Sequence, residues 1–334
     1  MKILITGGCG FIGSNLALAF SKDHDVTVFD SLTRKGSEKN LEWLTGNKKI
    51  KFVKGEITDF PLVTKLVKGQ DVVLHLAAQV AVTSSVSDPR RDFEVNALGT
   101  LNILEAARSC RKLPLITYAS TNKVYGNLKN ARYAEKSSRF IDKEHLKGVS
   151  EEEPLDFYSP YGCSKGTGDS YTKDYARIYN LPTIVFRKSC IYGTHQYGTE
   201  DQGWVAYFVR QALSNKEITL YGNGKQVRDL LFIDDLMNLY QKAITRFAEG
   251  KHVSGVFNVG GGVDNTVSLL ELIAKLEKLL GKKIKLKLAH ERPGDQKVYI
   301  TDIRKVSKEF SWKPKIGVEA GVDRLVEWVR GLVK

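Results

Sequence analysis

The chain has 334 residues, of which 42% are hydrophobic and 27% are charged, and its formal net charge is +13. This length can bury one large core or two modest ones. No apolar run approaches 18 residues and no signal-peptide pattern is visible, so the sequence predicts no membrane partner and a cytoplasmic location. The four cysteines are widely scattered without C-x-x-C spacing, which argues against a disulfide scaffold, and we predict no metal site.

The positive charge is dispersed rather than concentrated in one tail. Lysines recur through predicted helices and turns, as at 48–51 and 282–287, and we interpret most of them as solvated faces. No nucleic-acid-binding motif accompanies the charge, so nucleic acid is not a predicted partner. A positive field still attracts anionic small molecules.

The first thirty residues predict a strand, a tight glycine turn, a helix and a second strand. Gly7, Gly10 and Gly13 stand at G-x-x-G-x-x-G spacing between an apolar run at 2–5 and a helical pattern at 14–20. Glycine permits the turn, lets backbone N–H groups approach a pyrophosphate and lets the helix pack on the strand. In this context the spacing indicates a dinucleotide-binding loop.

Asp30 ends the next predicted strand, at 25–30. A carboxylate there accepts hydrogen bonds from both ribose hydroxyls of the adenosine and repels a 2′-phosphate, so we expect NAD rather than NADP. Arg34 and Lys35 follow closely and could soften that preference. The alternative is that Asp30 is a solvated strand end.

The next segments alternate between strand and helix patterns, which predicts an α/β fold with a parallel sheet and right-handed crossovers. Strands are expected at 50–53, 71–78 and 115–120, and helices at 37–45, 61–68 and 96–110. Residues 127–153 break this rhythm. We expect an inserted surface loop with a short helix, which either covers substrate or is a plain excursion of the surface.

The second half begins with a long helix at 159–179 and a strand at 181–187. Later elements are expected as a helix at 205–213, strands at 218–221 and 227–232, a turn at 222–225, a strand at 256–260 that returns to the main sheet, a helix at 268–280, a strand at 283–288 and a helix at 318–333. The elements after 262 would form a smaller lobe.

Tyr161 and Lys165 lie one helical turn apart and form the central chemical pair. An ammonium group and a bound oxidised nicotinamide both favour the phenolate of Tyr161, which could then remove a hydroxyl proton as hydride leaves the same carbon. Ser120 and Thr121, at the end of a predicted strand, could hold the reacting oxygen. Alternatively, the first pair is a helix-surface pair and the hydroxyls cap a strand end.

These motifs together resemble the extended short-chain dehydrogenase/reductase superfamily, in its NAD-dependent nucleotide-sugar epimerase/dehydratase branch. The resemblance rests on the glycine loop 6–13, Asp30, His75-Leu-Ala-Ala78, Asn96, Val124-Tyr-Gly126 and Tyr161-x-x-x-Lys165. It implies a Rossmann doubly wound parallel sheet and a homodimer formed through the helices at 96–110 and 159–179. It also implies an NAD-binding domain at 1–188 with a return segment at 229–262, and a smaller C-terminal nucleotide-sugar-binding lobe formed by 189–228 and 263–334.

The resemblance also implies residue roles. Tyr161 would be the catalytic base, Lys165 would anchor the nicotinamide ribose, and Thr121 with Ser120 would orient the sugar hydroxyl. The implied NAD-binding residues are Gly7, Gly10, Phe11, Ile12, Gly13, Asp30, Glu56, Ile57, Leu76, Ala77, Ala78, Asn96, Tyr161 and Lys165. The implied substrate-binding residues are Gln79, Asn122, Gln196, Arg228 and Arg292, the two arginines on the substrate pyrophosphate. Glu56 stands where the family usually has Asp, and we expect it to reach an adenine amine or a water.

The residues after Thr121 separate the activities within this branch. Dehydratases of the branch carry Asp-Glu there, whereas this chain has Asn122 and Lys123, so elimination of water lacks its acid and base. The segments 120–126, 201–204 and 222–229 resemble epimerases that oxidise C2 of a CDP-linked sugar, let the 2-keto ring turn over and return the hydride. A UDP-hexose 4-epimerase is the alternative, and a non-catalytic NAD-binding scaffold is an alternative of another class.

Overall fold

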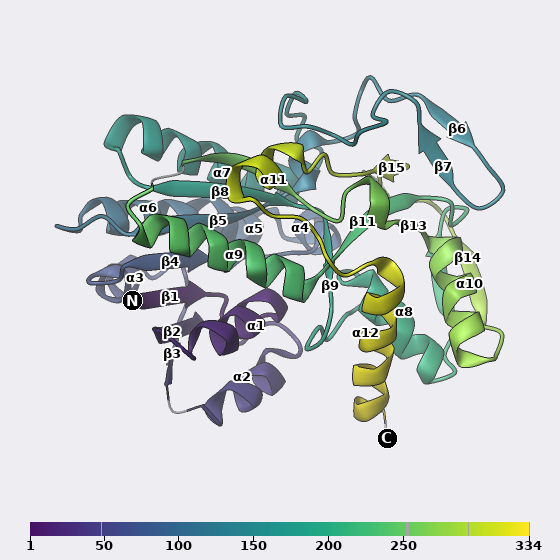
Figure 1. Ribbon diagram of the computed structural model, residues 1–334, viewed down its shortest axis with the longest axis horizontal. Helices are drawn as coiled ribbons and strands as arrows, with labels where there is room; N and C mark the ends of the chain where they lie inside the picture. The colour runs from purple at the N-terminus through teal and green to yellow at the C-terminus, as the bar shows by residue number, and fades with distance from the viewer. Residues whose placement is uncertain (48, 252–253, 293, 334) are drawn as a thin grey trace. The chain divides into compact units, whose positions relative to one another are not determined.

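The computed structural model describes residues 1–47, 49–251, 254–292 and 294–333 (Figure 1). The chain divides into two compact units. Unit 1 contains Met1–Val124, Phe157–Arg187 and Met237–Phe257, and unit 2 contains Tyr125–Asp156, Lys188–Leu236 and Asn258–Lys334. Residues 125–156 therefore fall in unit 2, whereas the predicted division grouped them with the first domain.

Unit 1 is built on a seven-stranded sheet in the order β12-β8-β5-β4-β1-β2-β3. The strand pairs from β5 to β3 are all parallel, which places their carboxyl ends at one edge. The strands are β1 Lys2–Thr6, β2 Asp25–Asp30, β3 Ile50–Lys54, β4 Val72–His75, β5 Leu115–Thr121, β8 Thr183–Lys188 and β12 Gly255–Val259. The predicted α/β class and the return of the 256–260 segment to the main sheet are confirmed.

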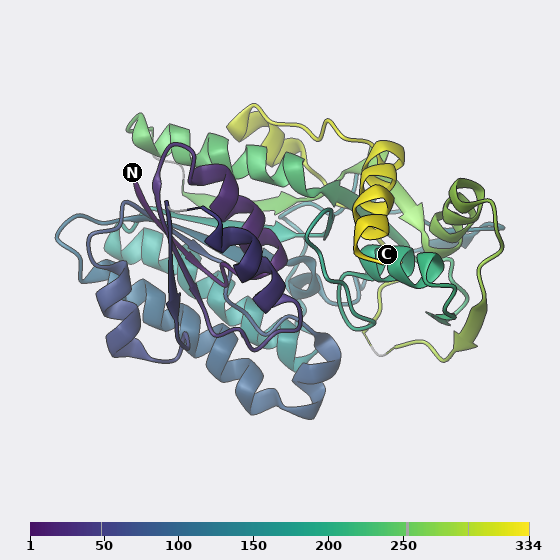
Figure 2. The same ribbon diagram turned by 90° about the horizontal axis from the view of Figure 1, so that it is seen from below.

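Helices cover both faces of this sheet, as the edge-on view in Figure 2 shows. One layer contains α3, α6 and α7, which contact one another in that order, and the other contains α1 and α9. Their bounds are α1 Phe11–Phe20, α2 Ser37–Thr45, α3 Phe60–Val67, α6 Gly99–Arg108, α7 Pro160–Tyr179 and α9 Ile233–Ala248. Buried Leu4, Val73 and Ile116 of the sheet pack with Ile103 and Leu104 of α6, so the core lies between sheet and helix layer.

The prediction that a helix starts at Asn96 is wrong, because helical structure begins earlier. α4 spans Val82–Ser87, α5 spans Pro89–Phe93, and a π-helical turn at Glu94–Leu98 joins α5 to α6. Asp88 caps α5 by accepting the Arg91 N–H at 3.0 Å, and Pro89 occupies the first turn, where its missing N–H costs nothing. The π turn inserts one residue into the helix, a feature frequent at functional sites, and Asn96 lies in it.

Unit 2 holds smaller sheets and several helices. β11 pairs with β9, β13 and β15, and β10 pairs with β14 in parallel. The elements are β9 Cys190–Tyr192, α8 Trp204–Leu213, β10 Ile218–Tyr221, β11 Val227–Phe232, β13 Thr266–Ser268, α10 Leu269–Leu280, β14 Leu286–Ala289, β15 Val298–Tyr299, α11 Arg304–Phe310 and α12 Val318–Leu332. Ser268 and Glu271 form a capping box that fixes the start of α10 as the sequence predicted.

The insertion contains a β-hairpin and no helix among its described residues, so the predicted short helix is wrong. β6 Tyr133–Glu135 pairs antiparallel with β7 Phe140–Asp142. Phe140 is buried against Val227 and Val298, which ties the hairpin to the rest of unit 2. Strands of three residues are too short to show an alternating pattern in the sequence.

Candidate active site

The glycine loop between β1 and α1 leaves no room for side chains. Gly7 has a φ of +65°, and a Cβ there would lie 2.7 Å from the Ala77 nitrogen. A Cβ on Gly13 would lie 2.3 Å from the Gly7 carbonyl oxygen. Both glycines are therefore required by close backbone approach at the carboxyl edge of the sheet.

The N-terminus of α1 is shaped for an anion. Gly10 is the N-cap, and no side chain caps this end of the helix in the described structure. Phe11 and Ile12 follow in the first turn, where backbone N–H groups and the helix dipole favour negative charge. This glycine cradle fits the pyrophosphate of a dinucleotide.

Asp30 lies at the end of β2 and faces the same loop. Its Oδ2 accepts the Cys9 N–H at 2.9 Å and its Oδ1 accepts the Leu32 N–H at 2.8 Å. Burial raises the pKa of this carboxyl, while the two backbone hydrogen bonds oppose the rise. Its position beside the cradle suits a ribose contact.

Glu56 follows β3 at the same edge and is engaged by an arginine. Its Oε2 lies 2.7 Å from Nη2 of Arg91 on α5, and both side chains are about two-fifths exposed. Ile57 beside it is buried, and its side chain occupies the space in which Gly99 would carry a Cβ. An ion pair with Arg91 was not anticipated for Glu56, which the sequence predicted to contact an adenine amine or a water.

A buried histidine fixes the end of β4. His75 Nδ1 lies 2.8 Å from Thr6 Oγ1 and Nε2 lies 3.1 Å from Thr100 Oγ1. Thr100 donates its own proton to the Asn96 carbonyl, so His75 carries its proton on Nε2 and accepts from Thr6 on Nδ1. Burial lowers the pKa of His75 to about 3, which keeps it neutral. Thr6 Oγ1 also accepts the N–H groups of Leu76 and Ala77, and these two residues with Ala78 are partly exposed at the sheet edge.

Asn96 holds the segment after β4 by a pair of hydrogen bonds. Its Oδ1 accepts the Gln79 N–H at 2.9 Å and its Nδ2 donates to the Gln79 carbonyl at 3.1 Å. The same Nδ2 lies within hydrogen-bond distance of Asp92 and Ser164. The Gln79 side chain bonds both backbone groups of Ala81. Asn96 therefore fixes the backbone of Gln79, just after β4, at the edge of the candidate site.

Tyr161, Lys165 and Thr121 are brought together by α7 and β5. Ser159 caps α7 through the Gly162 N–H, Pro160 starts the helix, and Tyr161 follows one residue later. The Thr121 side chain is hydrogen-bonded to Tyr161. Lys165 is 2% exposed, and its Nζ lies 4.2 Å from the centre of the Tyr118 ring on β5.

The Ser120 hydroxyl is engaged elsewhere. It donates to Asp169 Oδ2 at 2.6 Å, and Arg187 binds the same carboxylate through two hydrogen bonds of 2.8 and 2.9 Å. All three side chains are nearly inaccessible to solvent. Thr121 is therefore the hydroxyl that stands beside Tyr161, and Ser120 anchors the strand below it.

The prediction that Lys165 and a bound nicotinamide together favour the phenolate concerns the complex with NAD and stays a prediction. Burial raises the pKa of Tyr161 to about 12, with a smaller upward contribution from Asp92, while the Thr121 hydrogen bond and Arg34 lower it. Burial lowers the pKa of Lys165 to about 7, while Asp169 and Asp92 act to raise it. The sequence pattern could not reveal that Lys165 is almost completely buried whereas Tyr161 is partly exposed.

The predicted substrate-binding residues lie in both units. Asn122 Oδ1 is 3.3 Å from Thr121 Oγ1 in unit 1. In unit 2, buried Gln196 donates to the Ile191 carbonyl. Arg228 Nη2 lies 2.5 Å from Asp295 Oδ1, which brings the 294–295 segment against β11.

The other predicted substrate arginine, Arg292, lies in unit 2 on an aromatic ring. Its guanidinium lies 3.8 Å from the centre of the Tyr221 ring and donates to the Glu200 carbonyl. The Glu200 carboxylate is 3.7 Å away. This arrangement orients the planar donor fork that suits a phosphate.

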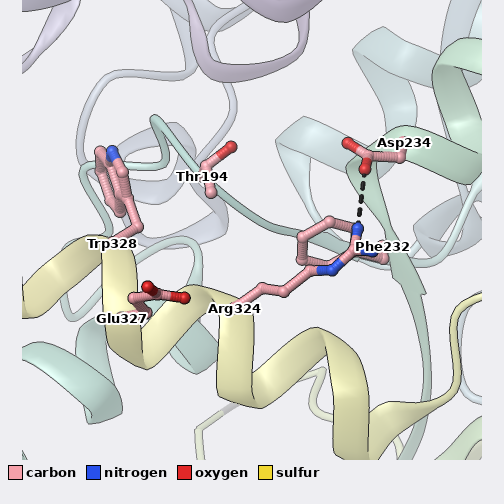
Figure 3. Close-up of a pocket in the computed structure, with 6 residues that line it drawn as sticks. All are labelled: Thr194, Phe232, Asp234, Arg324, Glu327 and Trp328. Carbon is pink, nitrogen blue, oxygen red and sulfur yellow. Dashed lines mark hydrogen bonds and ion pairs between the residues drawn. The ribbon is translucent and has the colours of Figure 1, made fainter.

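Figure 3 shows a surface pocket of unit 2 that includes none of the predicted site residues. Arg324 crosses it from α12 to pair with Asp234 at 3.0 Å. The remaining lining residues are Thr194, Phe232, Glu327 and Trp328. Arg324 and Asp234 pair with each other, and we assign this pocket no role.

Sequence reasoning missed four buried polar residues around Tyr161 and Lys165, namely Asp92, Ser164, Asp169 and Arg187. One signal was present. Asp92, Asn96 and Thr100 recur at intervals of four, which places a polar line on one helix face. Asp169 continues the face of Tyr161 and Lys165 in the same way, whereas nothing local marks Arg187.

Within the described ranges, no group of three or more histidine, cysteine, aspartate or glutamate side chains is arranged to hold a metal ion. In the same part of the chain, no helix is both long and apolar enough to cross a membrane.

Comparison with known proteins gives consistent matches over nearly the whole chain. Residues 4–325 match a family described as GDP-mannose 4,6 dehydratase. The chain is 44% identical to CDP-paratose 2-epimerase of Salmonella typhi, covering 99% of this chain and 100% of the relative, and 32% identical to a putative UDP-glucose 4-epimerase of Methanocaldococcus jannaschii, covering 98% of each. Among solved structures, UDP-glucuronic acid 4-epimerase from Bacillus cereus, in complex with UDP-glucuronic acid and NAD, has a TM-score of 0.85 at 29% identity and covers 99% of this chain and 100% of that one.

Proposed function

Because the chain belongs to the GDP-mannose 4,6-dehydratase family, whose matched relatives are nucleotide-sugar epimerases and dehydratases, we propose that this NAD-dependent isomerase inverts C2 of CDP-paratose or CDP-tyvelose. The assignment of the substrate rests on the 44% identity to CDP-paratose 2-epimerase, which covers 99% of this chain and 100% of the relative. The segments 120–126, 201–204 and 222–229 also resemble that enzyme.

We assign the cofactor to unit 1. The cradle of Gly7, Gly10 and Gly13 with Phe11 and Ile12 holds the pyrophosphate, and Asp30 holds the adenosine ribose. Glu56 and Ile57 border the adenine. Leu76, Ala77, Ala78 and Asn96 line the path to the nicotinamide. A nicotinamide held there would supply the acceptor, and later the donor, for the hydride of the sugar carbon.

Residues of α7 and β5 remove the proton of the sugar hydroxyl and return it. Thr121 holds the sugar hydroxyl beside the Tyr161 Oη, which removes the hydroxyl proton and later gives it back. Lys165 anchors the nicotinamide ribose, and its positive charge stabilises the phenolate that forms. Ser120 supports Thr121 from beneath, through Asp169.

Unit 2 binds the nucleotide sugar. Arg228 and Arg292 hold the pyrophosphate, because guanidinium donors match phosphate oxygens in pairs. The resemblance assigns Gln79, Asn122 and Gln196 to the sugar. The 2-keto ring turns about its pyrophosphate link before the hydride returns, so the opposite face is reduced.

We also propose a cytoplasmic homodimer. Tyr171, Ile178 and Tyr179 form an exposed apolar strip on α7, with exposed fractions of 47%, 57% and 42%. The four cysteines are free, as expected in a reducing compartment. Light scattering should give twice the chain mass for the wild type and a monomer for Ile178→Glu, and a monomeric wild type would contradict the dimer.

Proton NMR of the purified protein with NAD, incubated separately with CDP-tyvelose, CDP-glucose, UDP-glucose and UDP-glucuronate, tests the substrate. A C2 epimer from a CDP-sugar supports the proposal. A C4 epimer from a UDP-sugar supports the second candidate, a UDP-hexose 4-epimerase, which the Methanocaldococcus and Bacillus relatives favour.

The scaffold alternative is tested by Tyr161→Phe. Removal of the phenol oxygen should abolish most turnover while NAD still binds, because the oxygen handles the substrate proton. Unchanged biological activity in Tyr161→Phe would favour a non-catalytic NAD-binding scaffold.

A further inference from the structure

Asp92 is a buried carboxylate that the proposed chemistry does not use. It lies on α5, is 1% exposed, and packs beside α7. Its Oδ2 accepts from Ser164 Oγ at 2.5 Å and its Oδ1 accepts from Asn96 Nδ2 at 3.0 Å. Both partners are uncharged, and within the described part of the chain Asp92 forms no ion pair. Burying a carboxylate without a contacting cation is unfavourable, so the presence of Asp92 at this place needs an explanation.

Lys165 is the buried cation on which Asp92 acts through space. Its ammonium is 2% exposed and stands over the Tyr118 ring. The titratable groups that interact with it are Asp92 from α5, Asp169 from α7, His75 from β4 and Tyr118 from β5, and Tyr161 lies one helical turn earlier on α7. Burial lowers the pKa of Lys165 to about 7, while Asp169 and Asp92 raise it.

The other groups around Lys165 carry little net charge. Asp169 raises the pKa of Lys165 more than Asp92 does, but Asp169 is itself paired with Arg187 through two hydrogen bonds. His75 is neutral, and burial raises the pKa of Tyr118 far above neutrality. Of the two carboxylates that act on Lys165, Asp92 is the one without a contacting cation among the described residues. In a low-dielectric interior, such a charge acts strongly over several ångströms.

We propose that Asp92 is a positioning residue that keeps Lys165 in its ammonium form during the reaction. The inference rests on the proposed function, in which Lys165 stabilises the phenolate of Tyr161. Asp92 is held by Ser164 and Asn96 and acts on Lys165 through its charge rather than by contact with the reacting atoms. The lysine thus depends on a counter-charge that comes from a different helix.

Asp92→Asn removes the charge while keeping the hydrogen bonds. Ser164 Oγ lies 3.2 Å from the Tyr161 carbonyl, so its proton can turn there and its oxygen can accept from an amide at position 92. The amide oxygen still accepts from Asn96. Asp88→Asn is the matched control, because Asp88 is an exposed carboxylate at the start of the same helix and asparagine caps as well as aspartate.

The test follows the Lys165 side chain by NMR in protein labelled with carbon-13 at lysine Cε, with the signal assigned by its loss in Lys165→Met. In Asp92→Asn the Lys165 titration midpoint should move down by about one pH unit or more. In Asp88→Asn it should stay at the wild-type value. Equal midpoints in wild type and Asp92→Asn would overturn the proposal.

The wild type alone provides a second test that does not depend on a variant folding. Burial raises the pKa of Asp92, so the Lys165 signal should show a second inflection on the acid side where Asp92 takes up its proton. A single inflection would overturn the proposal.

Steady-state kinetics then distinguish an effect of the Asp92 charge from a structural effect of the substitution. In Asp92→Asn the alkaline limb of kcat should shift to lower pH, with KM for the sugar changed by less than about twofold. An unshifted alkaline limb, or a loss seen in KM alone, counts against the proposal. If wild type converts no sugar, the proposed function fails, while the lysine titration still decides the role of Asp92.

Discussion

Replacement of Arg187 by methionine probes the buried ion pair below the candidate site. The Arg187 side chain is 6% exposed and its partner Asp169 is 1% exposed. Two hydrogen bonds of 2.8 and 2.9 Å join them, and Ser120 donates a third bond to the same carboxylate. Methionine fills much of the arginine volume but provides no donor. Asp169 would then remain buried with the Ser120 hydroxyl and without its cation.

The expected cost follows from that uncompensated charge. Breaking a buried pair by removing one partner costs about 3–5 kcal/mol, whereas an exposed helical pair contributes about 0.3–0.5 kcal/mol. Arg90→Met is the matched control, since Arg90 pairs with Glu94 and is 90% exposed. The double variant Arg187→Met with Asp169→Leu should recover much of the loss, because it removes both charges.

Urea unfolding followed by circular dichroism measures these differences in the free energy of unfolding. A loss in Arg187→Met no larger than that in Arg90→Met would refute the reasoning. The same variant also bears on Lys165. Without Arg187, Asp169 becomes a second uncompensated carboxylate, so the Lys165 titration midpoint should rise, opposite to its shift in Asp92→Asn.

Three further predictions concern the cofactor loop and the insertion. Asp30→Ala should weaken NAD binding roughly 10- to 100-fold by calorimetry, since hydrogen bonds to a charged group contribute about 1.5–3 kcal/mol, and wild-type affinity would exclude the ribose role. Gly13→Ala should abolish NAD binding in the same titration, because its Cβ would meet the Gly7 carbonyl at 2.3 Å; retained affinity would contradict this account of the loop. His145 Nδ1 lies 2.7 Å from Asp142 Oδ2, and His145 Nε2 lies 3.3 Å from Glu153 Oε2. Burial lowers the pKa of His145, but the two carboxylates outweigh burial, so the pKa is raised. The stabilisation from protonated His145 is therefore complete below the pKa of the unfolded chain and lost as pH rises through the higher folded pKa. Urea midpoints across that range should fall in wild type but not in His145→Gln, and parallel slopes would contradict the prediction.

The layers of the fold were predictable because its signals are local. The glycine loop, the capping box at Ser268 and the apolar runs of the strands each fix an element within a few residues. The helix before Asn96 was missed although Asp88 and Pro89 form a standard start signal, because the π turn breaks the 3.6-residue period that would have joined α5 to α6. The β6–β7 hairpin was missed because three-residue strands leave no pattern.

Only those site residues that belong to a local sequence motif were predictable. Tyr161 and Lys165 share a helix face by spacing alone, and the structure adds Thr121 from β5 beside Tyr161. The partners that set their charges come from distant segments. Arg187 follows Asp169 by 18 residues and Asp92 precedes Ser164 by 72, so only the folded chain brings these pairs together. The almost complete burial of Lys165 could not be predicted either, since burial cannot be read from spacing.

The side chains after Thr121 favour hydride return over loss of water. Thr121 Oγ1 lies 3.3 Å from Asn122 Oδ1 and accepts the Lys123 N–H at 3.2 Å, so these two residues stand next to the hydroxyl that would hold the sugar. An elimination needs one group to take a proton and another to protonate the leaving hydroxyl. An amide is a poor acid and a poor base, and a lysine at position 123 does not replace the missing carboxylate. We therefore expect a keto sugar held at this site to be reduced rather than to lose water. NMR of the product should show that every oxygen of the ring carbons and of C6 is retained. A product that has lost a hydroxyl would mean that a carboxylate elsewhere performs the work that positions 122 and 123 perform in the dehydratases.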